Sequence, residues 1–151
     1  MDLSLTFHDN KTGHQDILLR FAGQEWICDS YYFAIDGELL PEVEDDRKIR
    51  AVLRRLHEQW LEAIETLKVG EVAYIPFDFS DQCTGWLRCT ATPTGYSVAQ
   101  GWSSLEGWSF SPSAVGELLH NLEGFRADGP TLEVVSSELL AAIRESASRA
   151  A

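Results

Sequence analysis

The longest regular pattern in the sequence is EDDRKIRAVLRRLHEQWLEAIETL, at residues 44–67. Its apolar residues recur at steps of three and four, which places them on one face of a helix. They are Ile49, Val52, Leu53, Leu56, Trp60, Ala63, Ile64 and Leu67. Acids at the start suit the helix dipole, and Gly70 beyond the end is a typical stop signal. The pattern predicts one long amphipathic helix in the middle of the chain.

The residues before this helix predict an antiparallel meander. Apolar residues alternate with polar ones at 3–7, and at 17–21 Ile17, Leu19 and Phe21 alternate with Leu18 and Arg20. Turn-forming residues separate the two runs. Aromatic and β-branched residues at 25–35 predict a third strand. Asp36-Gly37 predicts a tight turn, and Leu39-Leu40 a short return strand after it.

The residues after the helix predict a second group of strands. Residues 72–79 have strand composition, and Pro76 within them predicts an edge position or a bulge. Residues 86–92 and 96–102 flank Pro93-Thr94-Gly95, the pattern of a hairpin. We expect one face of this hairpin to carry Trp86, Arg88, Thr90, Tyr96, Val98 and Trp102.

The C-terminal third predicts two further helices. Ser111-Pro112 is a typical helix start, and apolar spacing continues the helix to Leu122. Asp128-Gly129-Pro130 predicts a turn, residues 131–135 fit a strand or a first helical turn, and residues 137–149 predict the last helix. The fold class is therefore α+β: a mainly antiparallel sheet of about six strands with the long helix and two C-terminal helices packed on it.

Length and composition indicate one acidic domain over residues 1–151. No apolar run approaches the roughly 20 residues that span a bilayer, and Met1–Ser4 lacks the basic start of a secretory signal. We expect a soluble, cytoplasmic protein that does not bind membranes. The three cysteines, Cys28, Cys83 and Cys89, lack paired spacing, so we interpret them as small buried hydrophobic residues.

The charge is strongly negative and unevenly distributed. The chain has a net charge of -12, and residues 1–46 alone carry 11 acids against 2 bases. Nucleic acids would be repelled by such a surface. The excess of acids either maintains solubility or steers a basic partner protein toward the N-terminal third.

No short motif indicates a catalytic mechanism. The sequence lacks the nucleotide-binding, nucleophile-elbow and zinc-protease patterns, and we name no catalytic residue, metal ligand or cofactor. Asp78 and Asp81 could bind a cation or act as an acid–base pair, but they also suit a turn. His8 and His14 have no common ligand spacing, so we expect exposed polar residues. Cys83 would need His57 or His120 beside it to act as a nucleophile.

Two other charged clusters have simple structural interpretations. The acids at 42–46 lack the pattern of an EF-hand and suit the start of the helix. A basic cluster follows them, which we interpret as a solvated, salt-bridged helix face: Arg47, Lys48, Arg50, Arg54 and Arg55.

Five tryptophans are many for 151 residues. Trp60 belongs to the helix stripe, whereas Trp86, Trp102 and Trp108 follow one another in the second strand region. They either fill a core or form an aromatic surface of the kind that anchors protein interfaces.

The favoured hypothesis is an acidic module that docks a basic partner protein. In size and charge the chain resembles small bacterial toxin-immunity proteins and secretion chaperones, although secretion chaperones commonly begin with a helix. The candidate partner-binding residues are Asp36, Glu38, Glu42, Glu44, Asp45, Asp46, Asp78, Asp81, Trp86, Trp102 and Trp108.

Two alternatives remain open. A small enzyme or ligand-binding protein would use a pocket near Asp78, Asp81, Trp86 and Trp102. A self-associating protein would pair its aromatic surfaces between copies. The sequence is compatible with a monomer and with a homodimer, and it does not decide whether the protein is an enzyme.

Overall fold

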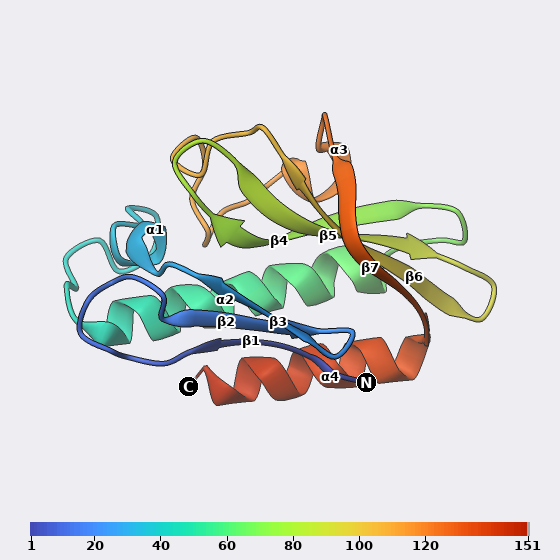
Figure 1. Ribbon diagram of the computed structural model, residues 1–151, viewed down its shortest axis with the longest axis horizontal. Helices are drawn as coiled ribbons and strands as arrows, with labels where there is room; N and C mark the ends of the chain where they lie inside the picture. Colours follow the sequence, from blue (N-terminus) through green and yellow to red (C-terminus); the bar gives the residue numbers. More distant parts are fainter. Residues whose placement is uncertain (151) are drawn as a thin grey trace.

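Two antiparallel sheets and four helices make up residues 1–150, the part of the chain that the computed structural model describes (Figure 1). The first sheet has the strand order β1-β2-β3 and the second the order β4-β5-β6-β7. The elements are β1 (Leu3–Phe7), β2 (Ile17–Phe21), β3 (Gln24–Cys28), α1 (Tyr31–Ala34), α2 (Asp46–Glu65), β4 (Val72–Phe79), β5 (Thr84–Ala91), β6 (Gly95–Ser103), α3 (Leu118–Asn121), β7 (Arg126–Val135) and α4 (Ser136–Arg149). The α+β class is confirmed, but the seven strands form two sheets, where we predicted about six in one.

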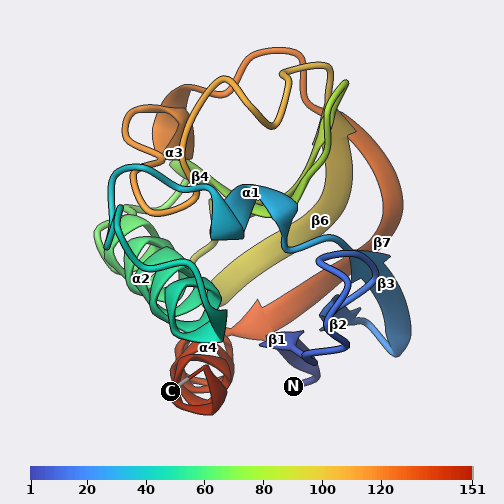
Figure 2. The same cartoon turned by 90° about the vertical axis from the view of Figure 1, so that its left-hand side faces the viewer.

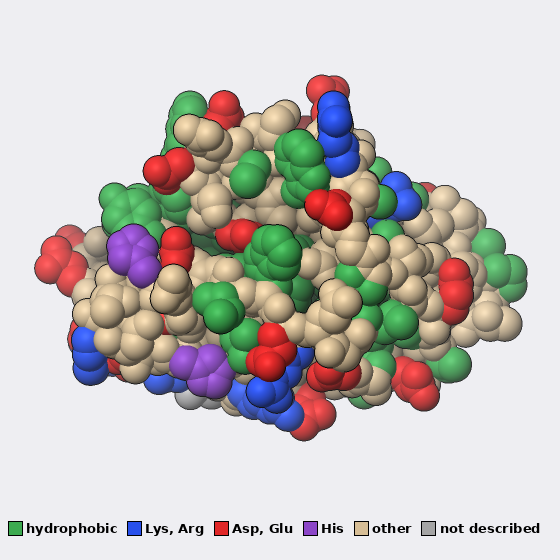
Figure 3. Space-filling view, viewed as in Figure 1, with side chains coloured by type: hydrophobic (Ala, Val, Ile, Leu, Met, Phe, Trp, Pro, Cys, Tyr) green, Lys and Arg blue, Asp and Glu red, His purple; other side chains and the backbone are tan. Residues whose placement is uncertain are grey.

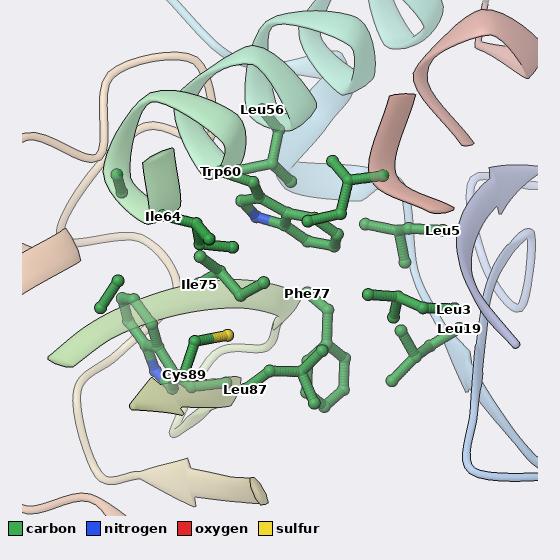
Figure 4. Close-up of a cluster of buried hydrophobic side chains, with 14 of the residues drawn as sticks. Leu3, Leu5, Leu19, Leu56, Trp60, Ile64, Ile75, Phe77, Leu87 and Cys89 are labelled. Carbon is green, nitrogen blue, oxygen red and sulfur yellow. The ribbon is translucent and has the colours of Figure 1, made fainter. Parts of the chain in front are cut away.

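The long helix α2 provides the apolar face on which both sheets pack. It begins two residues later than the 44–67 pattern, because Asp45 is its N-cap and accepts a 3.0 Å hydrogen bond from the amide of Arg47. It ends at Glu65, two residues before the end of the pattern. Figure 2 shows α2 and α4 on one side of the molecule and the two sheets on the other. In the core between them, Figure 4 shows side chains from α2 and both sheets: Leu56, Trp60, Ile64, Leu3, Leu5, Leu19, Ile75, Phe77, Leu87 and Cys89.

Strand β4 confirms the interpretation of Pro76. The strand lies at the edge of the second sheet, and its register shifts between Pro76 and Asp78. The carbonyl of Pro76 accepts a 3.1 Å hydrogen bond from the indole N–H of Trp60, which is fully buried. A buried indole needs such an acceptor, so this bond fixes α2 against the edge strand.

A buried polar cluster joins α2, α4 and β1. The Ser146 hydroxyl oxygen accepts a 2.8 Å hydrogen bond from the amide of Leu5 and lies 2.7 Å from His57 Nε2. His57 Nδ1 lies 2.7 Å from the carbonyl oxygen of Leu53 and therefore carries the ring proton, which leaves Nε2 to accept from Ser146. Burial lowers the pKa of His57 to about 4, so the ring is neutral in the folded protein.

The predicted strand at 25–35 is wrong beyond Cys28. The buried carboxylate of Asp16 accepts hydrogen bonds from the Ser30 amide and hydroxyl, at 2.9 and 2.6 Å. The carbonyl of Ser30 then accepts from the amides of Phe33 and Ala34, which forms the short helix α1. A tertiary side chain thus overrides the strand propensity of the aromatic run.

The predicted return strand at Leu39-Leu40 is also wrong, because these residues lie in bends. Lys48 Nζ donates a 3.0 Å hydrogen bond to the carbonyl of Leu40. Lys48 is therefore buried, with 2% of its surface exposed, and does not belong to the solvated basic face in which we placed it.

The β5–β6 hairpin exists, but its predicted face is wrong. Ala91 pairs with Tyr96, so Trp86 pairs with Gly101 and Trp102 with Gly85. Because side chains alternate along a strand, Trp86 and Trp102 point to opposite faces of the sheet. Tyr96 and Val98 share the face that packs on α2, whereas Trp86 is buried on the other face under Phe110, at a ring-centroid distance of 5.7 Å.

The predicted helix at 111–122 is wrong except for α3. The Asp36 carboxylate accepts hydrogen bonds from the Ser113 amide and hydroxyl, both 2.8 Å long. Gln59 of α2 accepts from the Val115 amide at 2.8 Å and donates to the Pro112 carbonyl at 2.9 Å. These two side chains occupy backbone groups that a helix would use, so the 104–117 segment lies irregularly over the edge of the second sheet.

The predicted turn at Asp128-Gly129-Pro130 is wrong, because these residues lie inside β7. Ala99 pairs with Thr131 and Gly101 with Ala127, which leaves the tripeptide bulged opposite Gln100. Residues 131–135 are strand, and α4 confirms the last predicted helix.

The Asp36 bonds predict a stability effect. Asp36→Ala would leave the buried Ser113 amide without its partner, so we expect the free energy of unfolding to fall by about 1–3 kcal/mol. Denaturant unfolding measures this change. The exposed neighbour Glu38 provides the control, because Glu38→Ala should change stability by less than about 0.5 kcal/mol. Equal effects of the two substitutions would contradict the anchoring role of Asp36.

The His57 environment predicts a pH dependence. Because its pKa is near 6.5 when unfolded and about 4 when folded, the unfolded state binds the proton first as the pH falls. The contribution of neutral His57 is complete above pH 6.5 and is lost toward pH 4, by on the order of 3 kcal/mol. Unfolding free energies measured across this range should therefore decline with falling pH.

The matched variants are His57→Gln and His120→Gln, since His120 is exposed. We expect the first to flatten the decline and the second to retain it. Identical pH slopes for the wild type and His57→Gln would show that another group causes the decline.

Candidate functional site

An open hollow of about 890 Å³ lies where α1, the loop after β1, the β4–β5 turn and the 104–117 segment meet. Figure 2 looks onto this side of the molecule, with α1 below the 104–117 segment. We call it the aromatic hollow. Its lining residues are His14, Asp29, Tyr31, Tyr32, Phe79, Ser80, Asp81, Gln82, Cys83 and Trp108.

Helix α1 places two tyrosines on one wall of the hollow. Phe33 of α1 is fully buried and packs edge-on against Phe79, with ring centroids 5.4 Å apart. This contact holds the short helix on the second sheet. Tyr31 and Tyr32 therefore face outward, with their rings in edge contact at 5.1 Å, and 49% of the Tyr31 surface is exposed.

The 104–117 segment places Trp108 on the opposite wall. The Gly107 amide donates a 2.7 Å hydrogen bond to the Ser80 carbonyl of the β4–β5 turn. A Cβ at position 107 would lie 2.5 Å from that oxygen, so the approach requires glycine. Trp108 follows directly, and 65% of its surface is exposed. A tryptophan so exposed at the rim of a hollow is available to contact another molecule.

Two carboxylates give the hollow a negative charge. The Tyr32 hydroxyl group donates a hydrogen bond to Asp81 Oδ1, and this bond raises the pKa of Tyr32 to about 12. Asp29 Oδ1 accepts a 2.7 Å hydrogen bond from the Gln15 amide, and Oδ2 lies 3.7 Å from His14 Nδ1. The hollow has no lysine or arginine among its lining residues. Carboxylates beside exposed aromatic rings suit a cationic ligand.

Asp78 lies behind the hollow and does not line it. Its carboxylate accepts hydrogen bonds from the Trp26 indole at 3.1 Å and from the Ser80 hydroxyl at 3.0 Å. Burial raises the pKa of Asp78. Asp78 thus joins β3 to β4, and the half-exposed Trp26 lies on the surface in front of it.

The acidic run at 36–46 lies outside the hollow. Asp36 is buried by its bonds to Ser113. Asp45 and Asp46 pair with Arg47 and Arg50 at 2.9 and 3.3 Å, and the bond from Arg47 lowers the pKa of Asp45. The remaining three predicted acids of the run are exposed: Glu38, Glu42 and Glu44.

The structure separates the three tryptophans that the sequence groups together. Trp86 is fully buried and donates a 2.6 Å hydrogen bond to the Thr84 hydroxyl, so it offers no surface. Trp102 is 37% exposed and lies under the guanidinium group of Arg126, 5.6 Å from the ring centroid. Of these three, the hollow contains Trp108. Trp102 and Trp108 therefore belong to different surfaces.

The sequence does not predict most of the wall that α1 and Asp29 form. Tyr31 and Tyr32 fall in the run interpreted as strand, and Asp29 was not singled out. The available signal was Asp29-Ser30 directly before the aromatic run, since such residues often precede a helix. No pattern in the sequence indicates that this run meets Trp108.

The space-filling view shows how charge is distributed over one face. In Figure 3, exposed hydrophobic and acidic side chains are mixed across the middle and left of the molecule, whereas the lysine and arginine side chains lie mainly along the lower edge and at the upper right.

The candidate metal and cysteine sites are not assembled. Within residues 1–150, no three His, Cys, Asp or Glu side chains are grouped as metal ligands, and His8 and His14 are exposed. Burial raises the pKa of the Cys83 thiol, which favours its protonated form. His57 contacts Ser146 instead of Cys83, and His120 lines a separate depression beside β4.

No helix within residues 1–150 is both long enough and apolar enough to cross a membrane. No protein-family model matches the sequence, and neither a curated protein nor a solved structure matches the chain.

The Tyr32–Asp81 bond predicts a local change in dynamics. Tyr32→Phe removes the only bond by which α1 holds the Asp81 carboxylate, so we expect faster hydrogen exchange at the amides of residues 80–83. Mass spectrometry of deuterated peptides measures this exchange. Tyr31→Phe is the control, because the Tyr31 hydroxyl has no hydrogen bond within residues 1–150. Equal exchange in both variants would show that the bond does not hold the turn.

Proposed function

We propose that the protein is an acidic protein-binding module that docks a basic partner protein at the aromatic hollow. The observation that carries the proposal is the composition of the hollow: exposed Tyr31 and Trp108, the carboxylates of Asp29 and Asp81, and no lysine or arginine in the lining. Exposed aromatic residues anchor interfaces, and uncompensated carboxylates select partners of opposite charge.

The charge of the whole chain supports the same partner. The net charge is -12, and most of the excess lies in residues 1–46, which contribute Asp29, Tyr31 and Tyr32 to the hollow. A field of this sign accelerates the encounter with a basic protein and repels acidic competitors. Such docking would serve to neutralise or to escort the partner, as toxin-immunity proteins and secretion chaperones do.

A second candidate is the binding of a small molecule in the same hollow, with or without catalysis. Its volume of about 890 Å³ falls within the range of ligand pockets, roughly 300–1,000 Å³. The hollow is open to solvent, however, and Asp78, Trp86 and Trp102 lie outside it. The open shape favours a protein partner, which can cover a wide opening, whereas the three residues outside the hollow are candidates for both functions and favour neither.

Affinity capture tests the proposal. The full chain, immobilised at low salt, should retain one basic protein from the source lysate in stoichiometric amount, and a salt gradient should release it because screening weakens charge steering and pairing. Trp108→Ala and Asp81→Asn should each lower the affinity about tenfold or more.

The controls are Trp102→Ala and Glu133→Gln, which change an exposed tryptophan and an exposed acid outside the hollow. Both should retain the partner. Equal retention by all four variants, or retention that does not depend on salt, would argue against docking at the hollow. An empty column together with a thermal shift on adding a small molecule would favour the second candidate.

A further inference from the structure

Three aromatic rings outside the hollow lie under the protein's own arginines: the half-buried Phe7 and Phe125 and the exposed Trp102. The guanidinium carbon of Arg50 lies 5.1 Å from the Phe7 ring centroid, that of Arg88 lies 4.9 Å from Phe125, and that of Arg126 lies 5.6 Å from Trp102. Within residues 1–150, such a contact is lacking for Tyr31 and Trp108 of the hollow and also for the half-exposed Trp26 outside it. The hollow therefore presents exposed aromatic faces that no arginine within residues 1–150 covers, and such faces can bind a guanidinium group.

The two carboxylates of the hollow keep free acceptor oxygens. Tyr32 binds Asp81 Oδ1 and so fixes the carboxylate, while Oδ2 has no hydrogen bond within residues 1–150. The Gln15 amide fixes Asp29 Oδ1 in the same way. Asp29 Oδ2 accepts no hydrogen bond within residues 1–150 and lies 3.7 Å from His14 Nδ1. No lysine or arginine of the described chain pairs with either acid.

The open shape of the hollow distinguishes between the two basic side chains. A lysine ammonium group is compact and strongly hydrated. An open site leaves most of that water around it, so the ammonium group gains little direct contact with the aromatic rings. A guanidinium group is weakly hydrated on its faces, so it can lie against an aromatic ring while its five N–H groups point to carboxylates at its edge.

We infer that the aromatic hollow receives an arginine side chain of the partner's docking segment. The guanidinium face contacts the exposed rings of Trp108 and Tyr31, and its N–H groups donate to the free oxygens of Asp81 and Asp29. This inference rests on the proposed function and names the group that the hollow recognises.

Three blocked pentapeptides test the inference on the full chain. Each carries glycine at four positions and arginine, lysine or citrulline in the centre, so that citrulline keeps the shape of arginine without its charge. The indole N–H signals of the ¹⁵N-labelled protein report binding, and Trp108→Phe assigns the Trp108 signal. We expect the arginine peptide to shift the Trp108 signal and to bind about two- to fivefold more tightly than the lysine peptide.

Matched variants locate the binding. Asp81→Asn and Trp108→Leu should reduce arginine binding to the level of the citrulline peptide, whereas Glu133→Gln and Trp102→Leu should leave it unchanged. Shifts confined to Trp26 or Trp102 would overturn the inference.

The remaining outcomes separate the inference from the proposed function. Equal binding of the arginine and lysine peptides at Trp108 would overturn the arginine preference and leave a basic partner in place. If neither charged peptide shifted a signal of the hollow, both the inference and the proposed function would fail.

Discussion

The fold depends on the requirement that α2 bury one apolar stripe against two separate sheets. Leu56, Trp60 and Ile64 have no exposed surface, and their neighbours come from both β1-β2-β3 and β4-β5-β6-β7. The Trp60 indole also needs an acceptor inside this apolar environment, and the Pro76 carbonyl at the edge of the second sheet supplies it. The helix thereby fixes the distance between the sheets, and the hollow forms where their loops meet beyond it.

The parts of the fold that the sequence predicts are those governed by local periodicity. The three- and four-residue spacing identifies α2 and α4, alternation identifies β1 and β2, and strand composition identifies β4. The errors lie where a distant side chain binds the backbone, as Asp16 does at Ser30 and Asp36 at Ser113. Propensity cannot anticipate a hydrogen bond across 77 positions of the chain.

The candidate site is predictable only in single residues. Asp81 and Trp108 stood out because acids and tryptophans suit an interface, yet the tyrosines opposite them come from a run with the composition of a strand. The register of the β5–β6 hairpin decides which face of the sheet Trp86 and Trp102 occupy. A shift of one residue would exchange the buried and the exposed face of a strand. Two acids of the 36–46 run, Asp45 and Asp46, form ion pairs with Arg47 and Arg50, so they offer less free negative charge than the sequence suggests.

The walls of the hollow are held largely by side chains that do not line it. Asp16 and Asp36 fix α1 and the 104–117 segment from beneath, and Gly107 lets that segment reach the β4–β5 turn. Rim positions such as Tyr31, Gln82 and Trp108 can therefore be exchanged without rebuilding the scaffold. A lineage carrying this fold could therefore vary the exposed lining of the hollow widely while the residues that anchor its walls stay the same, because exposed loop positions tolerate change better than the scaffold that positions them.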